Sequence, residues 1–168
     1  MSLLNLSARL LLILILLSCS SNGKEALPAT IHGKVIAIKD GDTIEILQNG
    51  KPLRIRLAHV DCPEIRKSQP FGKAAKQLTS DLCFGQEVKV LNDGTIDQYG
   101  RLIGVIINAK NQNVNKELVA AGMAWHFTRY SSDTLYANLE ITARENQVGL
   151  WIEDFPIPPW EWRNGKDK

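Results

Sequence analysis

The sequence predicts an α+β fold in which short strands form a barrel and helices cover its flanks. Five segments have the β-branched enrichment or the alternating pattern of short strands, and three others repeat apolar residues at helical spacing. A chain of 168 residues has room for one such domain with short appendages. We find no internal repeat and no second domain in the sequence, so we expect a single barrel with flanking helices.

The first three strands are predicted to form a meander. Ile31 to Ile38 is rich in β-branched residues and ends at a Lys-Asp-Gly turn, and Thr43 to Leu47 alternates like a second strand. Asn49-Gly50 is a strong hairpin signal, because both residues tolerate positive φ. Leu53 to Leu57 is then the returning strand.

Hairpin pairing also predicts which charged residues meet. The returning strand carries Arg54 and Arg56 on the face opposite its apolar residues. Antiparallel pairing places Asp42, at the start of the second strand, near the end of the third, where Asp61 and Glu64 follow. We therefore expect these three carboxylates to lie close together.

Two further strands and three helices complete the predicted domain. Val88 to Leu91 and Leu102 to Ile107 are the strands, joined by a polar loop that contains Asp97 to Arg101. Each helix is a segment with apolar residues at helical spacing and a glycine after it: Phe71 to Cys83 before Gly85, Val114 to Ala121 before Gly122, and Thr134 to Asn146 before Gly149. The Pro- and Trp-rich tail, Trp151 to Arg163, is expected to lie extended over the domain.

The first residues have the features of an export signal. Arg9 precedes the apolar run Leu10 to Leu17, which is far shorter than the ~20 residues of a membrane span and has the length of a signal-peptide core. The Leu-Ser-Cys sequence ending at Cys19 resembles the bacterial lipoprotein processing site, where the cysteine carries a diacylglycerol. We expect residues 1–18 to be a lipoprotein signal peptide, Cys19 to be lipidated, and residues 19–29 to tether the exported protein to a membrane of the cell envelope. Secretion after ordinary signal cleavage is the alternative.

Two cysteines remain if Cys19 is lipidated. In an exported protein, Cys62 and Cys83 could form a disulfide. Cys83 lies on the apolar face of a predicted helix, however, and is more simply a small core residue.

Charge is distributed unevenly along the chain. The formal net charge is only +2, which does not by itself indicate a protein that binds polyanions. Lys51 to Lys76 nevertheless holds seven basic and two acidic residues, whereas Ser131 to Glu161 holds six acidic residues and Arg144. This separation is compatible with one face that attracts phosphates, and equally with an ordinary mixed surface.

Three segments carry residues that could act in chemistry. Asp40-Gly41-Asp42-Thr43 makes a tight turn with outward carboxylates, which suits a hard cation. Arg56 to Glu64 (RLAHVDCPE) places Asp61 and Glu64 after a strand that carries an arginine. Tyr99-Gly100-Arg101 sets a loop arginine beside an aromatic ring. Each segment alone could be no more than an acidic turn, a solvated strand residue or an exposed loop charge.

Taken together, the three segments resemble the staphylococcal nuclease (thermonuclease) family. The shared pattern is Asp-Gly-Asp-Thr, then Arg-Leu-x-x-Val-Asp-x-Pro-Glu, then Asp-x-Tyr-Gly-Arg, in this order and near these spacings. The resemblance continues through Gly122-Met123-Ala124-Trp125, Tyr130 and Gly149-Leu150-Trp151, and covers Ile31 to Trp151.

The resemblance implies a fold and an activity. The fold is a five-stranded OB-like β-barrel with three flanking helices over residues 30–151, followed by a C-terminal tail at residues 152–168. The activity is calcium-dependent hydrolysis of phosphodiester bonds in DNA and RNA, leaving 3′-phosphate ends. We expect the protein to act as a monomer with one Ca²⁺ ion.

The family's cation ligands and its water-activating residue match four positions. By this resemblance, Asp42 and Asp61 would bind Ca²⁺ through their carboxylates, and Cys62 through its main-chain carbonyl. Glu64 would position or deprotonate the attacking water. These few protein ligands would leave several water molecules on the ion, and we therefore expect a modest affinity for the metal.

The resemblance assigns the substrate contacts to two arginines and two tyrosines. Arg56 and Arg101 would grip the scissile phosphate, because a planar guanidinium matches phosphate oxygens. Tyr99 would contact a neighbouring phosphate, and Tyr130 would stack on a base or meet the terminal phosphate. Thr128, which cannot stack, stands where the staphylococcal enzyme has another tyrosine.

Two other functions would suit the same fold. A barrel of this class can bind nucleic acid without cutting it. A pure binder has no need for Asp42, Asp61 and Glu64, however, because carboxylates repel phosphate unless a cation intervenes. A structural envelope lipoprotein would leave all three motifs unexplained.

The histidines and the tail tryptophans have simple structural interpretations. His32, His59 and His126 lack the spacing of a zinc site and are expected to be structural or surface residues. Trp160 and Trp162 could stack on nucleotides, but a Pro-bounded tail that covers apolar surface explains them better.

Overall fold

The computed structural model describes residues 29–165 of the chain. The predicted signal peptide and the predicted lipidation site Cys19 lie outside the described residues. Within the described part, the structure contains no helix with the length and apolar character needed to cross a membrane.

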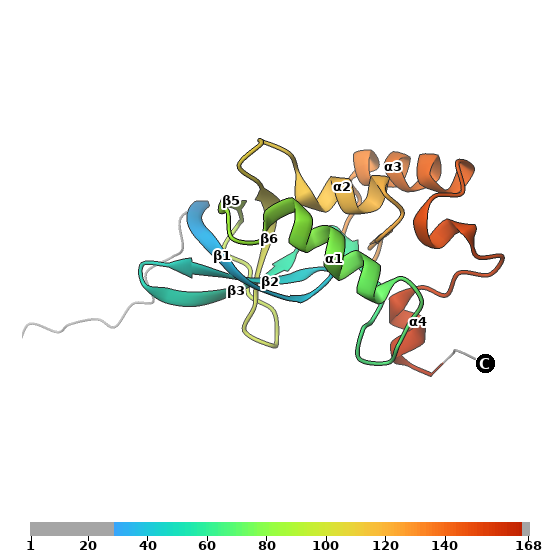
Figure 1. The fold of residues 1–168 in the computed structure, drawn as a ribbon, viewed down its shortest axis with the longest axis horizontal. Coiled ribbons are helices and arrows are strands. Elements are labelled where there is room, and N and C mark those ends of the chain that lie inside the picture. Colours follow the sequence, from blue (N-terminus) through green and yellow to red (C-terminus); the bar gives the residue numbers. More distant parts are fainter. Residues whose placement is uncertain (1–28, 166–168) are drawn as a thin grey trace, which may run out of the picture.

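The centre of the molecule is a closed barrel of five strands (Figure 1). The strands are β1 (Thr30–Asp40), β2 (Thr43–Gln48), β3 (Lys51–Leu57), β5 (Glu87–Leu91) and β6 (Leu102–Ile107). They follow one another around the barrel in the order β1-β2-β3-β6-β5, with β3 and β6 parallel and the other neighbours antiparallel. The predicted α+β class and the five-stranded barrel are confirmed.

The β2–β3 hairpin sets the register on which the candidate site depends. Asn49 and Gly50 both have positive φ, at 50° and 74°, as a tight hairpin turn requires. The register that follows sets Thr43 opposite Arg56. The start of β2 and the end of β3 therefore lie side by side, as the hairpin signal predicts.

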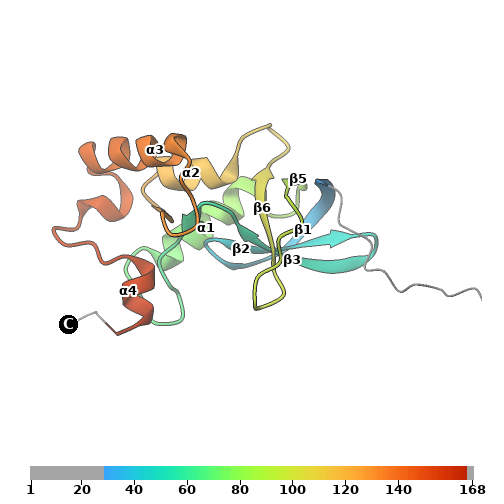
Figure 2. The ribbon, with the colours of Figure 1, turned by 180° about the vertical axis from the view of Figure 1, so that it is seen from behind.

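Three helices cover the barrel (Figures 1 and 2). They are α1 (Gly72–Cys83), α2 (Val114–Ala120) and α3 (Thr134–Glu145). The first two pack against the barrel, and α3 packs on α2. Asn113 and Asp133 cap the N-termini of α2 and α3 with side-chain oxygens, which explains where these helices begin.

The apolar side chains of the strands and helices form one main core. Ile44, Ile55 and Leu118 are fully buried there, and burying a side chain of this kind contributes about 1.5–3 kcal/mol. A smaller cluster contains Trp125 and Trp151, whose rings meet edge to face at 4.5 Å. This second cluster supports the C-terminal part of the chain.

The C-terminal segment differs from the prediction. The expectation of a wholly extended tail is wrong, because η1 (Gly149–Ile152) is a 3₁₀-helix and α4 (Pro159–Arg163) is a short α-helix. Proline suits the first position of α4, because the N–H that proline lacks would have no acceptor within the helix at that position. Two short strands, β4 (Val60–Asp61) and β7 (Trp125–His126), pair with each other and were also missed, since two residues show no periodicity.

Candidate active site

The candidate site lies at the end of the barrel where β1 passes into β2. Gly41 and Asp42 form the turn. A glycine is needed there, because a Cβ atom would lie 2.8 Å from the Cβ of Cys62 and 2.9 Å from that of Ala75. The Leu57 N–H donates to the Asp42 carbonyl at 2.9 Å, which fixes the turn against the end of β3.

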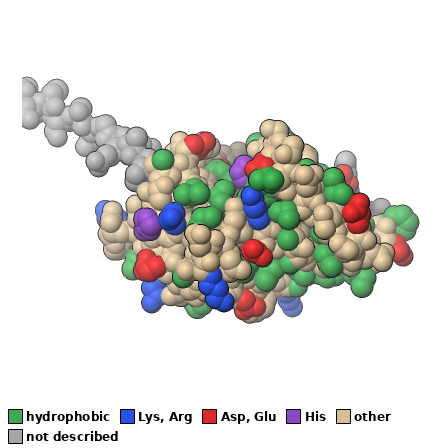
Figure 3. Space-filling model, turned by 90° about the horizontal axis from the view of Figure 1, so that it is seen from above, with side chains coloured by type: hydrophobic (Ala, Val, Ile, Leu, Met, Phe, Trp, Pro, Cys, Tyr) green, Lys and Arg blue, Asp and Glu red, His purple; other side chains and the backbone are tan. Residues whose placement is uncertain are grey.

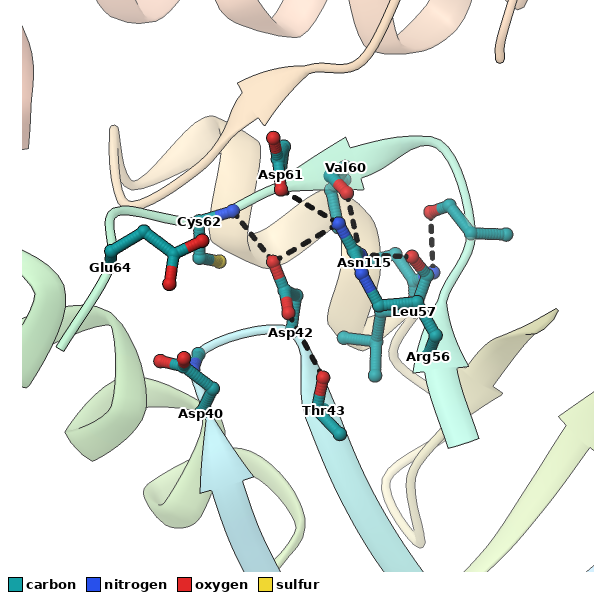
Figure 4. Close-up of polar contacts among 12 residues, drawn as sticks. Asp40, Asp42, Thr43, Arg56, Leu57, Val60, Asp61, Cys62, Glu64 and Asn115 are labelled. Atoms are coloured by element: carbon teal, nitrogen blue, oxygen red, sulfur yellow. Dashed lines mark hydrogen bonds and ion pairs between the residues drawn. The ribbon is translucent and has the colours of Figure 1, made fainter. Parts of the chain in front are cut away.

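Arg56 of β3 is the central side chain of this site (Figure 4). Its Nη1 donates to the carbonyls of Leu57 and Val60, both at 2.7 Å. Its Nη2 contacts Asp61 Oδ1 at 2.8 Å and Asp42 Oδ2 at 3.2 Å. Burial alone would lower the pKa of Arg56, but the two carboxylates outweigh burial and raise it, so the guanidinium stays charged.

The carboxylates of Asp42 and Asp61 flank one point, since the same nitrogen of Arg56 touches both. Asp42 also accepts hydrogen bonds from the Cys62 N–H at 2.8 Å and from the Thr43 hydroxyl at 3.2 Å. The Asp61 side chain is only 1% exposed. Burial and the charge of Asp42 raise the pKa of Asp61, while neighbouring arginines oppose that shift.

Glu64 lies on the loop that follows β4. Its backbone N–H donates to Gln69 Oε1 at 2.9 Å, and its carboxylate accepts from Arg163 Nη1 at 2.6 Å. In Figure 4 the carboxylate of Glu64 faces the same space as those of Asp40 and Asp42. Burial, the charge of Asp42 and, more weakly, that of Glu64 raise the pKa of Asp40 to about 6, which reflects how close these acids are.

Arg101 approaches from the loop between β5 and β6. Asp97 organises this loop, because one of its oxygens accepts from the N–H groups of Tyr99 and Arg101, at 2.9 and 3.0 Å. The other oxygen holds the Arg101 guanidinium at 2.7 Å. Arg101 Nη1 then donates to Thr43 Oγ1 at 3.2 Å, next to Asp42. The parallel pairing of β3 with β6 is what carries this loop to the site.

The two predicted substrate-binding tyrosines lie on the surface. Tyr99 and Tyr130 are each 70% exposed. The Arg101 guanidinium lies 5.3 Å from the centre of the Tyr99 ring, and Phe127 meets the Tyr130 ring edge to face at 4.9 Å. Both rings are therefore accessible for stacking, but neither contacts the buried carboxylates.

Arg163 of α4 is a site residue that the sequence analysis missed. Its guanidinium contacts Asp61 Oδ2 at 2.8 Å and Glu64 Oε1 at 2.6 Å. Burial would lower the pKa of Arg163, but hydrogen bonds and charge from these two acids raise it. A lone arginine behind two tryptophans has no spacing that would have identified it, because it meets its partners about 100 residues away in the sequence.

The predicted ligands suit one hard divalent cation by their chemistry. They are two carboxylates and one main-chain carbonyl, an all-oxygen set that calcium accepts while keeping waters. Within residues 29–165, no group of three or more His, Cys, Asp or Glu side chains is placed to hold a metal ion. Four acids gather here with two arginines: Asp40, Asp42, Asp61, Glu64, Arg56 and Arg163. Lys76 adds a weaker positive charge beside Asp40, so the cluster keeps a net negative charge.

Two histidines and both cysteines of the described chain have structural roles, whereas His32 is exposed on β1. His59 Nδ1 and His126 Nε2 both hydrogen-bond to Ser131 Oγ, at 2.9 and 2.8 Å. Cys62 and Cys83 are buried and unpaired, so the alternative of a disulfide between them is wrong. Burial raises the pKa of both thiols.

The surface charge does not mark a single phosphate-binding face in the view of Figure 3. Lys and Arg side chains are interspersed there with Asp and Glu and with hydrophobic groups. The separation of charge along the sequence is therefore not visible as a one-signed patch on this face.

Comparison with known proteins gives consistent matches. The family profile described as staphylococcal nuclease homologue matches residues 54–153, a range that includes Arg56, Asp61, Glu64 and Arg101 but not Arg163. An uncharacterized endonuclease of Escherichia coli O157:H7 is 39% identical over 138 residues, which are 82% of this chain and 88% of that protein.

Two further relatives extend the match. An uncharacterized endonuclease of Haemophilus influenzae is 39% identical over 155 residues, 92% of this chain and 82% of that protein. A micrococcal nuclease of Shigella flexneri is 38% identical over 145 residues, which span 80% of this chain and 82% of that one.

Proposed function

The chain belongs to the staphylococcal nuclease family of phosphodiester-hydrolysing enzymes, and we propose that it cuts DNA and RNA with one calcium ion and leaves 3′-phosphate ends. The observation that carries the proposal is Arg56, buried between Asp42 and Asp61 with Glu64 close by. Carboxylates at a phosphate site repel the substrate unless a cation intervenes. A protein that only bound nucleic acid would gain nothing from this arrangement.

The cation would be held by the carboxylates of Asp42 and Asp61 and by the main-chain carbonyl of Cys62. When bound, calcium supplies positive charge to the phosphate oxygens as negative charge grows on them. The Cys62 N–H already fixes one oxygen of Asp42, so the carboxylate is oriented before any ion arrives. Cys62 contributes only backbone atoms to this scheme, which is why its side chain can be buried and inert.

The two arginines would stabilise the same phosphate from different sides. Arg56 is charged and held by two carbonyls, so its positive charge is in place before the substrate binds. Arg101 would add a second guanidinium from the neighbouring loop. Removing one such donor typically costs about 3–4 kcal/mol of transition-state stabilisation.

Glu64 would orient the attacking water and accept its proton. In the proposed step, the water oxygen bonds to phosphorus, its proton passes to Glu64, and the bond from phosphorus to the 5′ oxygen breaks. The 5′ oxygen takes a proton from solvent water, and Glu64 returns its proton to the solvent. The phosphate then stays on the 3′ oxygen. Tyr99 and Tyr130 would hold the flanking nucleotides, since both rings are exposed and the ring of Tyr99 lies beside Arg101.

The proposal also includes a location. We propose that the protein is exported, processed before Cys19 and held at a membrane of the cell envelope by a lipid on that cysteine, where it acts as a monomer. The support is the apolar run followed by Leu-Ser-Cys in the sequence. Mass spectrometry of the N-terminal peptide after expression in a bacterial host would identify the lipid, and an unmodified or uncleaved Cys19 would contradict this part.

One assay tests the proposed activity. The full-length protein in detergent would be incubated with single- and double-stranded DNA and RNA in calcium, magnesium or a chelator, and the product ends identified. We expect cleavage in calcium, none in the chelator, and 3′-phosphate ends. Undiminished cleavage in the chelator would contradict the role of the cation, and intact substrate in calcium after long incubation would contradict nuclease activity.

A further inference from the structure

The C-terminal helix α4 is fastened to the loop that carries Glu64. Lys67 Nζ donates to the Arg163 carbonyl at 2.6 Å, and Trp162 Nε1 donates to the Lys67 carbonyl at 3.3 Å. Figures 1 and 2 both show α4 beside this loop. None of these contacts uses a site carboxylate, so the helix would keep its place whatever binds there.

A second link runs from the tail to the backbone of Glu64. Gln69 Nε2 donates to the Ile157 carbonyl at 2.7 Å, while Gln69 Oε1 accepts from the Glu64 N–H at 2.9 Å. The Gln69 side chain is buried between these partners. Trp160 adds apolar support, because its ring stacks on Phe127 at 5.4 Å.

The guanidinium of Arg163 joins the two acids that follow β3. Nη1 contacts Glu64 Oε1 at 2.6 Å and Asp61 Oδ1 at 3.2 Å, and Nη2 contacts Asp61 Oδ2 at 2.8 Å. Within residues 29–165, Arg163 is the only side chain that hydrogen-bonds to the Glu64 carboxylate. Without it, Glu64 would be a partly exposed carboxylate on a loop, repelled by Asp61.

The acids of this cluster carry more charge than the neighbouring bases supply. Asp40, Asp42, Asp61 and Glu64 are matched by Arg56 and Arg163, with Lys76 as a weaker positive neighbour of Asp40. The excess is negative, so the charge of the site favours a cation in addition to the arginines. Arg163 contacts both oxygens of Asp61, and Arg56 contacts Oδ1, so the two guanidiniums share this carboxylate.

We infer that Arg163 is a positioning residue of the nuclease, which holds the Glu64 carboxylate against Asp61 in the orientation that water activation needs. The inference rests on the proposed function and deepens it, because it makes the C-terminal helix part of the active site. Arg163 would act through Glu64 and would not touch the scissile phosphate. Its loss would therefore lower kcat and leave KM almost unchanged.

Kinetics of three variants of the full-length protein in detergent, compared with the wild type at saturating calcium, would test the inference. We expect Arg163→Ala to lower kcat by up to about 10²-fold, the cost of a catalytic group misplaced by about 1 Å. Arg163→Lys should recover part of the rate, since an ammonium can hold one acid but cannot bridge two. Arg54→Ala is the matched control, because it removes an arginine of similar exposure (50% against 40%) from Glu45, which contacts none of the site residues Asp42, Asp61 and Glu64.

A double-mutant cycle separates positioning from general structural support. If Arg163 acts through Glu64, the variant that combines Glu64→Ala with Arg163→Ala should be no slower than Glu64→Ala alone. A fully additive loss would overturn the inference. So would wild-type kcat in Arg163→Ala, or a variant with a raised KM and an unchanged kcat.

Crystal structures of the wild type and Arg163→Ala, each with and without calcium, give a readout that needs no activity. We expect Arg163 to keep its contact with Glu64 in both wild-type forms, and Glu64 to move or lose order in the variant. Displacement of Arg163 by calcium, with tighter calcium binding by Arg163→Ala in calorimetry, would overturn the inference. Arg163 would then compete with calcium for the carboxylates of Asp61 and Glu64. If the wild type cuts no nucleic acid, the proposed function fails, and the position of Glu64 in these structures still decides the role of Arg163.

Discussion

Arg56 and Tyr99 lie at the same end of the barrel but in very different surroundings. The Arg56 side chain is 11% exposed and meets two carbonyls and two carboxylates, whereas Tyr99 is 70% exposed and rests only beside Arg101. The first region is organised before any ligand arrives. In the second region the exposed ring can gain further contacts only when a ligand binds.

The two regions are expected to control different properties of the protein. In the buried region, charges are balanced against one another, so a substitution changes stability, cation affinity and rate together. In the exposed region a side chain can be removed without leaving a buried charge unpaired. Such a change should alter the hold on the substrate and little else.

The largest effect is expected for Arg56→Ala. Nuclease activity should fall by about 10²–10³-fold. The free energy of unfolding without calcium should fall by about 3–5 kcal/mol, because Asp42 would lose its buried ionic partner and Asp61 would keep only Arg163. Rate assays and denaturant titrations measure the two quantities. Arg54→Ala, which removes only an exposed ion pair with Glu45, should change stability by less than about 1 kcal/mol. Equal stability of both variants would refute the buried-charge argument.

Calcium should stabilise the buried region measurably. At a concentration about 100 times its Kd, the ion would add about 2.7 kcal/mol to the free energy of unfolding. Thermal melts with calcium and with a chelator report this change. The shift should disappear in Asp42→Asn, which keeps the shape of the side chain but removes its charge. A wild-type protein that melts at the same temperature under both conditions would argue against the cation site.

Arg101 lies between the two regions and should show an intermediate response. Arg101→Ala is expected to reduce kcat by about 10²-fold with a smaller loss of stability than Arg56→Ala, because its side chain is 23% exposed against 11% for Arg56. Asp97→Asn should cause a smaller loss of kcat, since it loosens the loop but keeps the guanidinium. Steady-state kinetics of both variants measure this order. A larger effect of Asp97→Asn would mean that the loop matters more than the charge.

Smaller effects are expected for the exposed tyrosines. Tyr99→Ala and Tyr130→Ala should raise KM for an oligonucleotide, with a loss of about 1–3 kcal/mol per stacked base, while kcat stays near that of the wild type. Tyr99→Phe and Tyr130→Phe are the matched controls, because they keep the ring. If the phenylalanine variants lose as much as the alanine variants, the hydroxyl and not the ring makes the contact.

The smallest effect is expected when the folded protein is treated with an alkylating reagent, because both thiols are buried. Burial raises the pKa of Cys83 to about 12 and raises that of Cys62 as well, so at pH 8 almost no reactive thiolate forms. Neither residue should be alkylated in the folded protein, and both should react in denaturant, as peptide mapping would show. Rapid alkylation of Cys62 under native conditions would mean that the region around Gly41 opens.

Much of the fold could be predicted because its signals are local. Asn49-Gly50 fixes the β2–β3 hairpin, and that hairpin alone brings Asp42 toward Arg56 and Asp61. The short β4–β7 pair and the helix α4 could not be predicted, since segments of two to five residues are too short for periodicity to appear. Their conformations depend on what they pack against.

By itself the sequence determined the barrel, the three main helices and the order of the motifs, because strand alternation, helical spacing and turn residues act over a few positions. Only the tertiary structure decided that Arg163 meets Asp61 and Glu64, which lie 102 and 99 residues earlier. It also decided that Arg101 reaches Thr43, through the parallel pairing of β3 with β6. These contacts form because the closed barrel and the packed tail bring distant backbone segments together. A pattern of a few neighbouring residues does not predict which distant residues will be in contact.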